Sequence, residues 1–231
     1  LWNLTLDGEG ARSDGGLKFT DVADMTGLGQ ISLNDIGWGA SFADFDLDGR
    51  LDLLVANGST FQRPDDVSRL VPMRMRLFWQ GAGSDGFFDL SQVSGQVFAE
   101  ERVSRGAAFA DYDEDGDVDV LVMNHQDAPW LLRNDSATAN RWLKVRVQCG
   151  PGGLPCLGAT VEIEAGEIQT AAGRQRREIG SQSSYLSQNA PEAVFGLGAA
   201  ESAATVRVVF PGGGEQVRTN VEANQTIHVR E

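Results

Sequence analysis

Hydrophobic positions along the chain fall in short alternating runs, and the spacing of an amphipathic helix is rare. Val, Ile, Thr and aromatic residues fill these runs, and Gly, Asn and Asp separate them. Such alternation is typical of β-strands joined by tight turns. The pattern therefore predicts an all-β fold for this 231-residue chain.

Three kinds of run recur in the same order across residues 1–135. They are an aromatic run at 1–3, 76–79 and 130–134, a Phe-x-Asp-hydrophobic run at 19–22 and 87–90, and a Gly-Ala-x-Phe-Ala run at 39–43 and 106–110. An acidic loop and an apolar run follow the last of these, at an offset of 111 − 44 = 67 residues. Four strands at a fixed period indicate a propeller blade or a solenoid coil. Residues 58–75 interrupt the first copy and predict an insertion loop on one face.

The acidic loop is the most specific signal in the sequence. Residues 44–52 and 111–119 each place Asp at positions 1, 3, 5 and 9 and Gly at position 6. Carboxylates this close repel one another unless a cation lies between them. Ca²⁺ accepts about 6–8 oxygen ligands, and a tight loop with Gly at its turn can present them.

We therefore predict two calcium sites. Positions 1, 3 and 5 would give carboxylates, position 7 its backbone carbonyl, and position 9 a closing carboxylate. The predicted ligands are Asp44, Asp46, Asp48, Arg50 and Asp52 in the first loop and Asp111, Asp113, Asp115, Asp117 and Asp119 in the second.

An EF-hand begins with the same Asp spacing but needs Glu at position 12 between two helices. Position 12 is Val55 in the first loop and Val122 in the second, and both loops lead into β-rich runs. The sequence thus predicts a loop between strands, with the ninth-position Asp already on the following strand. The alternative is an acidic solvated turn, which two loops of identical spacing and flanks disfavour.

Motifs of residues 1–135 resemble the FG-GAP/VCBS repeat family, the calcium-binding blades of integrin-α-like β-propellers. The resemblance is carried by Phe-Ala-Asp-x-Asp-x-Asp-Gly-x-x-Asp at 42–52 and 109–119. It implies that each loop holds one Ca²⁺ that stiffens its blade. Closed propellers use about 4–8 blades, and this chain supplies about two. We therefore expect further blades upstream of Leu1, and the alternative is that the two blades pack against another structure.

Beyond residue 135 the acidic loops stop and the chain changes character. A polar link at 136–140 precedes alternating runs at 142–147, 158–164, 168–170, 206–210 and 226–229, with a hairpin turn at 211–214. These runs predict an antiparallel β-sandwich over 136–231. Cys149 and Cys156 flank a loop between two of its strands, and we expect them to be bridged, although two free thiols are the alternative.

The second half resembles the ASPIC/UnbV domain, found after such repeats in cartilage acidic protein-like proteins. The matching motifs are Asn-Arg-Trp-Leu at 140–143, Leu-Gly-Ala at 157–159, Gly-Ser-Gln-Ser-Ser-Tyr-Leu-Ser-Gln-Asn at 180–189, Phe-Gly-Leu-Gly at 195–198 and Phe-Pro-Gly-Gly-Gly at 210–214. The chain departs from the family in the Cys149–Cys156 loop and in Phe210, where the family has Trp.

No catalytic constellation is apparent. His125 and His228 are the only histidines, and both are expected to be ordinary surface or half-buried side chains. Tyr185 and Gln188 are expected to anchor a loop, with ligand contact as the weaker alternative. The basic cluster of Arg174, Arg176 and Arg177 is expected on a solvated strand face or against an acidic partner.

The net charge is −14, which argues against nucleic acid and anionic membranes as partners. No run of about 18 apolar residues occurs, so no membrane insertion is expected. The chain begins at Leu1 without a recognisable signal peptide, so we expect a trimmed start, from which export cannot be inferred. The predicted calcium loops indicate an oxidising, calcium-rich exterior, so we expect a secreted, periplasmic or cell-surface protein.

These features favour a non-enzymatic, calcium-stabilised extracellular interaction or adhesion module with an unknown protein or glycan partner. The alternative is part of an exported enzyme or carbohydrate-binding protein whose site lies on other blades.

Overall fold

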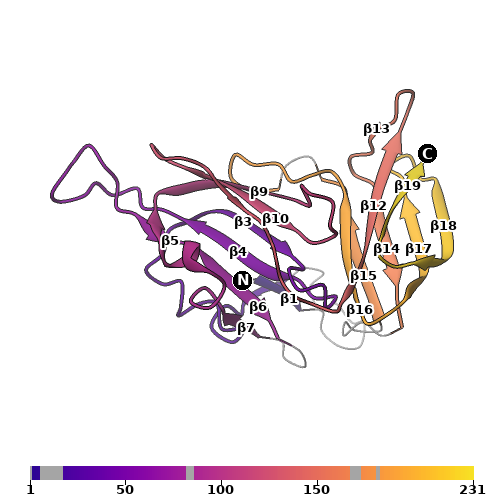
Figure 1. Cartoon of the computed structure of the whole chain (residues 1–231), viewed down its shortest axis with the longest axis horizontal. Coiled ribbons are helices and arrows are strands. Elements are labelled where there is room, and N and C mark those ends of the chain that lie inside the picture. Colours follow the sequence, from indigo (N-terminus) through magenta and orange to yellow (C-terminus); the bar gives the residue numbers. More distant parts are fainter. Residues whose placement is uncertain (1, 6–17, 82–85, 167–172, 181–182) are drawn as a thin grey trace.

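A computed structural model describes residues 2–5, 18–81, 86–166, 173–180 and 183–231. Within these residues the fold is all-β, and the one helical element is a short 3₁₀ turn, η1 (Gln96–Ala99). The strands of the N-terminal half are β1 (Trp2–Thr5), β2 (Lys18–Asp21), β3 (Gly37–Ala43), β4 (Asp52–Asn57), β5 (Met73–Arg74), β6 (Arg76–Gln80), β7 (Phe87–Asp89), β8 (Glu101–Arg102), β9 (Ser104–Ala110), β10 (Asp119–Asn124) and β11 (Trp130–Leu132). They form sheets β1–β2, β3–β4–β6–β7, β9–β10–β11 and β5–β8 (Figure 1).

The sequence repeat is also a structural repeat, but each sheet begins at the Gly-Ala-x-Phe-Ala strand, and the predicted four strands form only in the first: β3–β4–β6–β7 has four strands and β9–β10–β11 has three. In β3–β4, Ser41 lies opposite Leu54, and in β9–β10 their counterparts Ala108 and Leu121 lie opposite each other. Both pairs of strands shift register at the equivalent place. The shift lies next to the pair Gly37↔Asn57 in the first sheet and next to the pair Ser104↔Asn124 in the second. Both acidic loops lead directly into a strand that begins at position 9, as the sequence predicted.

The two larger N-terminal sheets stack on each other through opposite faces. Leu54 and Ala56 of the first sheet share one buried cluster with Phe109, Val120 and Val122 of the second. The chain between β4 and β5 projects from the end remote from the C-terminal half (Figure 1). This agrees with the predicted insertion loop.

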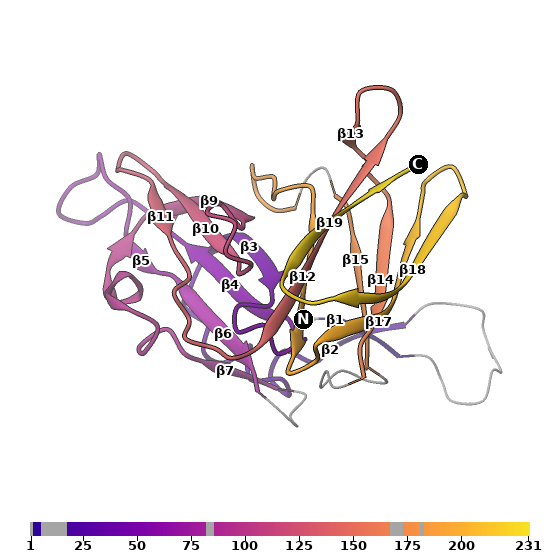
Figure 2. The same cartoon turned by 45° about the vertical axis from the view of Figure 1, so that its right-hand side comes forward.

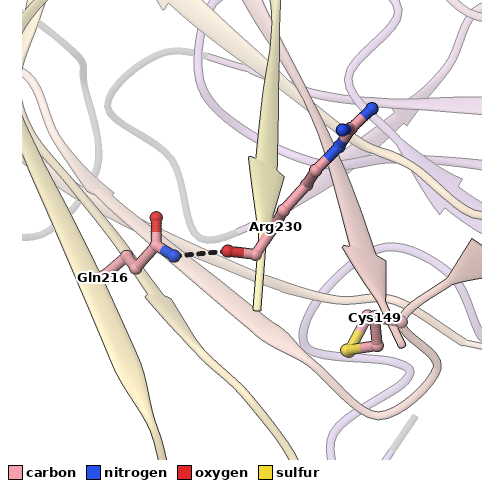
Figure 3. Close-up of a disulfide and its surroundings, with 4 residues drawn as sticks. Cys149, Gln216 and Arg230 are labelled. Atoms are coloured by element: carbon pink, nitrogen blue, oxygen red, sulfur yellow. Dashed lines mark hydrogen bonds between the residues drawn. A yellow bond between two sulfur atoms is a disulfide. The ribbon is translucent and has the colours of Figure 1, made fainter. Parts of the chain in front are cut away.

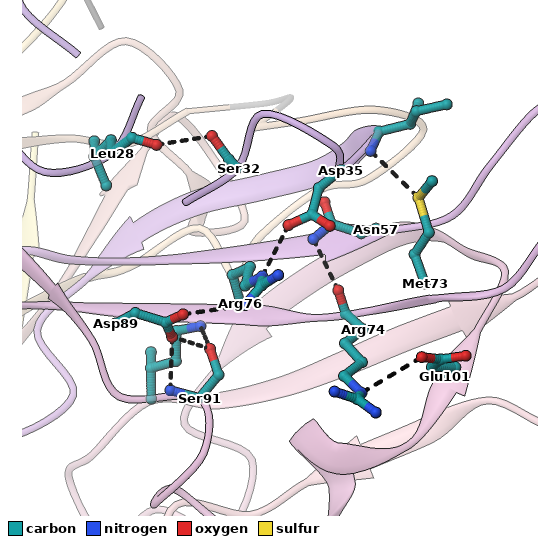
Figure 4. A network of polar contacts seen from close by, with 12 residues as sticks. Leu28, Ser32, Asp35, Asn57, Met73, Arg74, Arg76, Asp89, Ser91 and Glu101 are labelled. Carbon is teal, nitrogen blue, oxygen red and sulfur yellow. Dashed lines mark hydrogen bonds and ion pairs between the residues drawn. The ribbon is translucent and has the colours of Figure 1, made fainter. Parts of the chain in front are cut away.

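The Asp of the Phe-x-Asp run has a structural role that the sequence did not reveal. Asp89 accepts hydrogen bonds from the backbone N–H of Ser91 (2.9 Å) and from Arg76 Nη1 (3.1 Å). Arg76 Nε also donates to Asp35 at 2.8 Å, which holds the segment before β3 against the sheet (Figure 4). These charged groups therefore satisfy one another, beside the apolar contacts that Leu28 makes with Phe78 and Phe87.

The C-terminal half is a two-sheet sandwich. Its strands are β12 (Arg141–Cys149), β13 (Leu154–Pro155), β14 (Thr160–Glu164), β15 (Arg174–Glu178), β16 (Ala193–Gly198), β17 (Ser202–Val209), β18 (Glu215–Glu222) and β19 (Gln225–Arg230). One sheet has the order β13–β12–β16 with β19 also paired to β12, and the other has the order β15–β14–β17–β18. Alternate residues of both sheets form a single buried cluster. The predicted strand at 168–170 lies outside the described residues.

The prediction of a purely antiparallel sandwich was wrong in one respect, because β12 and β19 are parallel. The chain crosses from the second sheet to the first after β18, and the start of β19 is fixed beside the start of β12. Asn224 donates its backbone N–H to the Trp142 carbonyl (2.7 Å) and accepts one from the Trp142 N–H (3.2 Å). Two strands that start at the same end must run in the same direction.

A disulfide joins Cys149 and Cys156, as expected, and closes the loop between β12 and β13. Beside it, the side chain of Gln216 donates to the carbonyl of Arg230, which links β18 of one sheet to β19 of the other (Figure 3). Both ties stabilise the end of the sandwich where the chain finishes.

The two halves lie side by side, with β12 and β16 facing the N-terminal sheets (Figures 1 and 2). Residues 183–190 run from the C-terminal half along β3 and β9. Asn189 accepts the Phe109 N–H (3.1 Å), and Ser184 Oγ accepts the Ala40 N–H (2.7 Å). The ring of Tyr185 packs edge-on against Trp38, with centroids 4.6 Å apart. Tyr185 therefore anchors a loop, but to the other half of the molecule.

Candidate metal centre

Both acidic loops adopt the same tight backbone path. Position 4 has a left-handed conformation in each, with φ of 60° at Leu47 and 63° at Glu114. The position-6 glycines, Gly49 and Gly116, have φ of 95° and 106°, values that L side chains rarely adopt. These turns fold the chain back so that alternate side chains point to a common centre.

The loops bring together the first three acids of each pattern. Oxygens of Asp44, Asp46 and Asp48 lie within 4.8 Å of one another, and so do oxygens of the second set. The second set is Asp111, Asp113 and Asp115. A triangle of hard oxygen ligands of this size suits Ca²⁺, which binds oxygens at about 2.3–2.6 Å.

The position-1 carboxylates carry the strongest indication of a missing charge. In each, Oδ2 accepts the N–H of the loop glycine, at 2.9 Å for Asp44 and 3.0 Å for Asp111. The other oxygen, Oδ1, is buried and has no hydrogen-bond donor in either residue. A buried polar atom without a partner costs on the order of 1–3 kcal/mol, and more when the group is charged. A cation at the centre of the loop removes that cost, so the residues present fit Ca²⁺.

The electrostatics of the first loop agree with this. Burial raises the pKa of Asp44 well above its ordinary value, and the neighbouring carboxylates of Asp48, Asp52 and Asp46 raise it further. Both effects disfavour negative charge, and a bound dication reverses both of them.

The position-9 acids lie outside the two groups of three, and their predicted role as closing ligands stays a prediction. Asp52 accepts the backbone N–H groups of Phe45 (3.1 Å) and Gln80 (2.9 Å). Asp119 accepts those of Tyr112 (3.0 Å) and Asn134 (2.8 Å) in the same way. Asp52 thus ties its loop to β6, and Asp119 ties its loop to the residues just beyond β11. Spacing alone does not reveal this role. Burial raises the pKa of Asp52 to about 7.

Position 7 differs between the loops. The Arg50 side chain is buried and pairs with Asp48, with Nη2 and Oδ2 2.9 Å apart. Asp117 has a buried Oδ1 without a donor, and burial together with the charges of Asp115 and Asp119 raises its pKa to about 8. The second loop therefore holds more uncompensated acid than the first.

Several groups that contact the loops were missed from the sequence. Trp79 Nε1 donates to Asp46 Oδ2 at 2.8 Å. From the C-terminal half, the Gly196 N–H donates to Asp44 Oδ2 at 3.1 Å, and the Lys144 ammonium contacts Asp111 Oδ2. The recurring aromatic run was a signal for Trp79, but nothing local marks Lys144 or Gly196.

The other candidate residues do not converge. His125 and His228 are exposed. Arg174 and Arg176 are exposed and pair with Glu164 and Glu162 on the neighbouring strand. Arg177 departs from the predicted solvated face: it is half-buried, with its guanidinium 5.2 Å from the centre of the Phe195 ring.

Comparison with known proteins gave a family match within the C-terminal half. Residues 153–231 match the ASPIC and UnbV family. The ASPIC and UnbV region spans β13 to β19 and contains four of the five motifs that suggested it, all except the one at 140–143. No curated protein matched the chain. No helix among the described residues is long and apolar enough to cross a membrane.

Proposed function

We propose that this chain is a calcium-binding extracellular interaction module in which the ions are structural. The observation that supports it most is the pair of buried, donor-free Oδ1 atoms on Asp44 and Asp111, at equivalent positions of two repeats. One such atom is compatible with a local defect of packing. Two related by the same register point to a common ligand.

Asp44, Asp46 and Asp48 would hold one ion, and Asp111, Asp113 and Asp115 the other. Bound Ca²⁺ supplies positive charge that neutralises each acidic cluster and fixes the loop. Because an unfolded loop cannot form such a site, the binding free energy adds to folding stability. Extracellular modules bind with dissociation constants of about 10⁻⁴–10⁻³ M, and we expect affinity in that range or tighter.

Thermal unfolding with calcium and with EGTA tests the proposal. We expect chelation to lower the melting temperature, and Asp46→Ala and Asp113→Ala each to remove part of the calcium effect. Asp65→Ala is the matched control, because Asp65 is an exposed acid paired with Arg63 outside both loops. A melting temperature that does not respond to chelation would contradict a structural role for calcium.

The resemblance to FG-GAP/VCBS blades belongs to the same proposal. Each unit turns one face of its sheet to the next, as propeller blades do: Leu54 and Ala56 of the first sheet are covered by the second. Their counterparts Leu121 and Met123 are 42% and 50% exposed. This arrangement supports a partial propeller to which another blade of the same kind could be added.

The disulfide supports the proposed location. Disulfides persist in oxidising compartments and are rare in the reducing cytosol, and Cys149 and Cys156 are bridged. We therefore propose a secreted, periplasmic or cell-surface protein, where calcium is also abundant enough to fill weak sites. Expression in an oxidising and in a reducing compartment, followed by labelling of free thiols, tests the bridge. We expect Cys149 and Cys156 to resist labelling after oxidising expression and to be labelled after reducing expression.

A further inference from the structure

The same carboxylate in each loop faces both the metal centre and the C-terminal half. Oδ1 of Asp44 and of Asp111 is free, while Oδ2 accepts a hydrogen bond from the loop glycine and a second one from outside the loop. The outside donors are the Gly196 N–H for Asp44 and the Lys144 ammonium for Asp111. Two repeats therefore use one design to contact the C-terminal half.

Those two donors come from neighbouring strands. Gly196 lies on β16 and Lys144 on β12, and Trp142 of β12 pairs directly with Gly196. One strand pair thus spans both loops. We call this pair, residues 141–149 and 193–198, the loop-facing ladder.

The ladder fits a single loop shape closely. A Cβ on Gly196 would lie 2.2 Å from Asp44 Oδ2 and 2.5 Å from Leu47 Cα. A Cβ on Gly116 of the second loop would lie 2.0 Å from the Trp142 ring. Because neither contact leaves room for a side chain, the ladder can dock only when the loops keep this path.

Backbone hydrogen bonds extend the fit. The Gly198 N–H donates to the Leu47 carbonyl at 3.0 Å, and the side chain of Asn140, just before β12, donates to the Asp46 carbonyl at 2.8 Å. Both carbonyls belong to the turn that the metal would organise. If the acids repelled each other apart, these acceptors would move away from their donors.

The charges are matched loop by loop. The first loop has four acids and Arg50, and it meets neutral N–H groups from the ladder. The second has six acids over residues 111–119, and it meets Lys144 and Arg146, whose Nη2 lies 2.9 Å from Glu114 Oε1. After one dication binds to each loop, the second loop keeps more negative charge than the first. The cations of the ladder, Lys144 and Arg146, contact that second loop.

We propose that the loop-facing ladder is an interaction surface that recognises the metal-bound loops, so that calcium binding and docking of the C-terminal half are thermodynamically linked. Lys144 and Gly196 are positioning residues in this linkage. The inference rests on the proposed calcium function. By reciprocity, docking tightens calcium binding by the factor by which calcium tightens docking.

Reactivity of the Lys144 amine gives a direct readout in the full chain. Lys144 is fully buried, and it is one of only two lysines, so peptide mass spectrometry after reductive methylation reports it alone. We expect at least about tenfold faster modification in EGTA than in calcium. Equal protection of Lys144 in both conditions, in a protein shown by calorimetry to bind two ions, would overturn the linkage and leave the calcium function intact.

The reciprocal arm uses Gly196→Ala with Gly166→Ala as the control, because a Cβ at Gly166 meets nothing within 4 Å. We expect Gly196→Ala to weaken calcium binding about tenfold at one of two sites. Gly166→Ala should leave the calcium affinity of both sites unchanged. Unchanged calcium binding in a folded Gly196→Ala variant would overturn the linkage. If that variant fails to fold, the Lys144 measurement on the unmodified chain decides alone. A native chain that binds no calcium would overturn both proposals.

Discussion

At the scale of the residue, the Asp side chains of one loop have different structural roles although they are the same residue type. Asp44 and Asp111 divide their two oxygens between the proposed metal centre and the ladder. Asp52 and Asp119 instead accept backbone N–H groups with both oxygens. The Asp at position 9 is therefore a brace between strands, and its loss should damage folding even when calcium is absent.

Trp79 offers a test at this scale. Its indole N–H orients Asp46, and outer-sphere partners of metal ligands typically contribute about 10–100-fold in affinity. We expect Trp79→Phe to weaken one of two calcium sites about tenfold by calorimetry. Trp130→Phe, a change on β11 where Trp130 packs beside Arg102, should leave both sites unchanged. Loss of affinity at both sites in Trp79→Phe would argue for a general packing defect.

At the scale of the element, the repeat gives pairs of equivalent positions in different surroundings. Leu54 on β4 is 2% exposed because the second sheet covers it, whereas Leu121 on β10 is 42% exposed. Both lie at the same register of the same kind of strand. The difference between them is set by stacking alone.

Glutamine at each of these positions measures that difference. Leu54→Gln buries an amide without a partner and should lower the free energy of unfolding by about 3 kcal/mol. Leu121→Gln should change it by less than about 0.5 kcal/mol. Denaturant unfolding of the two variants decides the point. A large loss of stability for Leu121→Gln would mean that this face of β10 is covered, which would contradict the exposure of Leu121.

At the scale of the whole molecule, stability depends on how many protons and ions the loops hold. The ordinary Asp pKa is 3.8, and burial raises that of Asp52 to about 7 and that of Asp117 to about 8. The metal-free folded state therefore keeps protons that the unfolded chain releases. The contribution of these two groups to stability is greatest at low pH and falls as the pH rises from about 4 through 7–8.

Calcium should reverse this trend, because it replaces those protons. We expect the gain in melting temperature on adding calcium to be small near about pH 5 and large near about pH 8. Scanning calorimetry across this range checks it, with Asp117→Asn as the comparison that flattens part of the profile. If calcium raised the melting temperature by the same amount at every pH, calcium would not be replacing bound protons, and the prediction would be contradicted.

Much of this architecture could be predicted from the sequence, because the relevant signals are local. The strand that begins at Asp52, the turn at Gly49 and the bridge between Cys149 and Cys156 each depend on neighbours in the chain. Contacts of Lys144 and Gly196 could not be predicted, since they join residues 33 and 152 positions apart. The parallel pairing of β19 was missed for the same reason: strand direction is decided by a crossover between sheets.

The burial of Lys144 has a consequence for dissecting the protein. Residue 136 looks like a natural place to cut, since the polar link there separates two kinds of sequence. In a fragment that starts at this point, the Lys144 ammonium would lack its Asp111 partner, and the Gly196 and Gly198 N–H groups of β16 would lack their acceptors. Independent folding of residues 136–231 would then require those groups to reach water, so a soluble fragment needs new polar surface along β12 and β16.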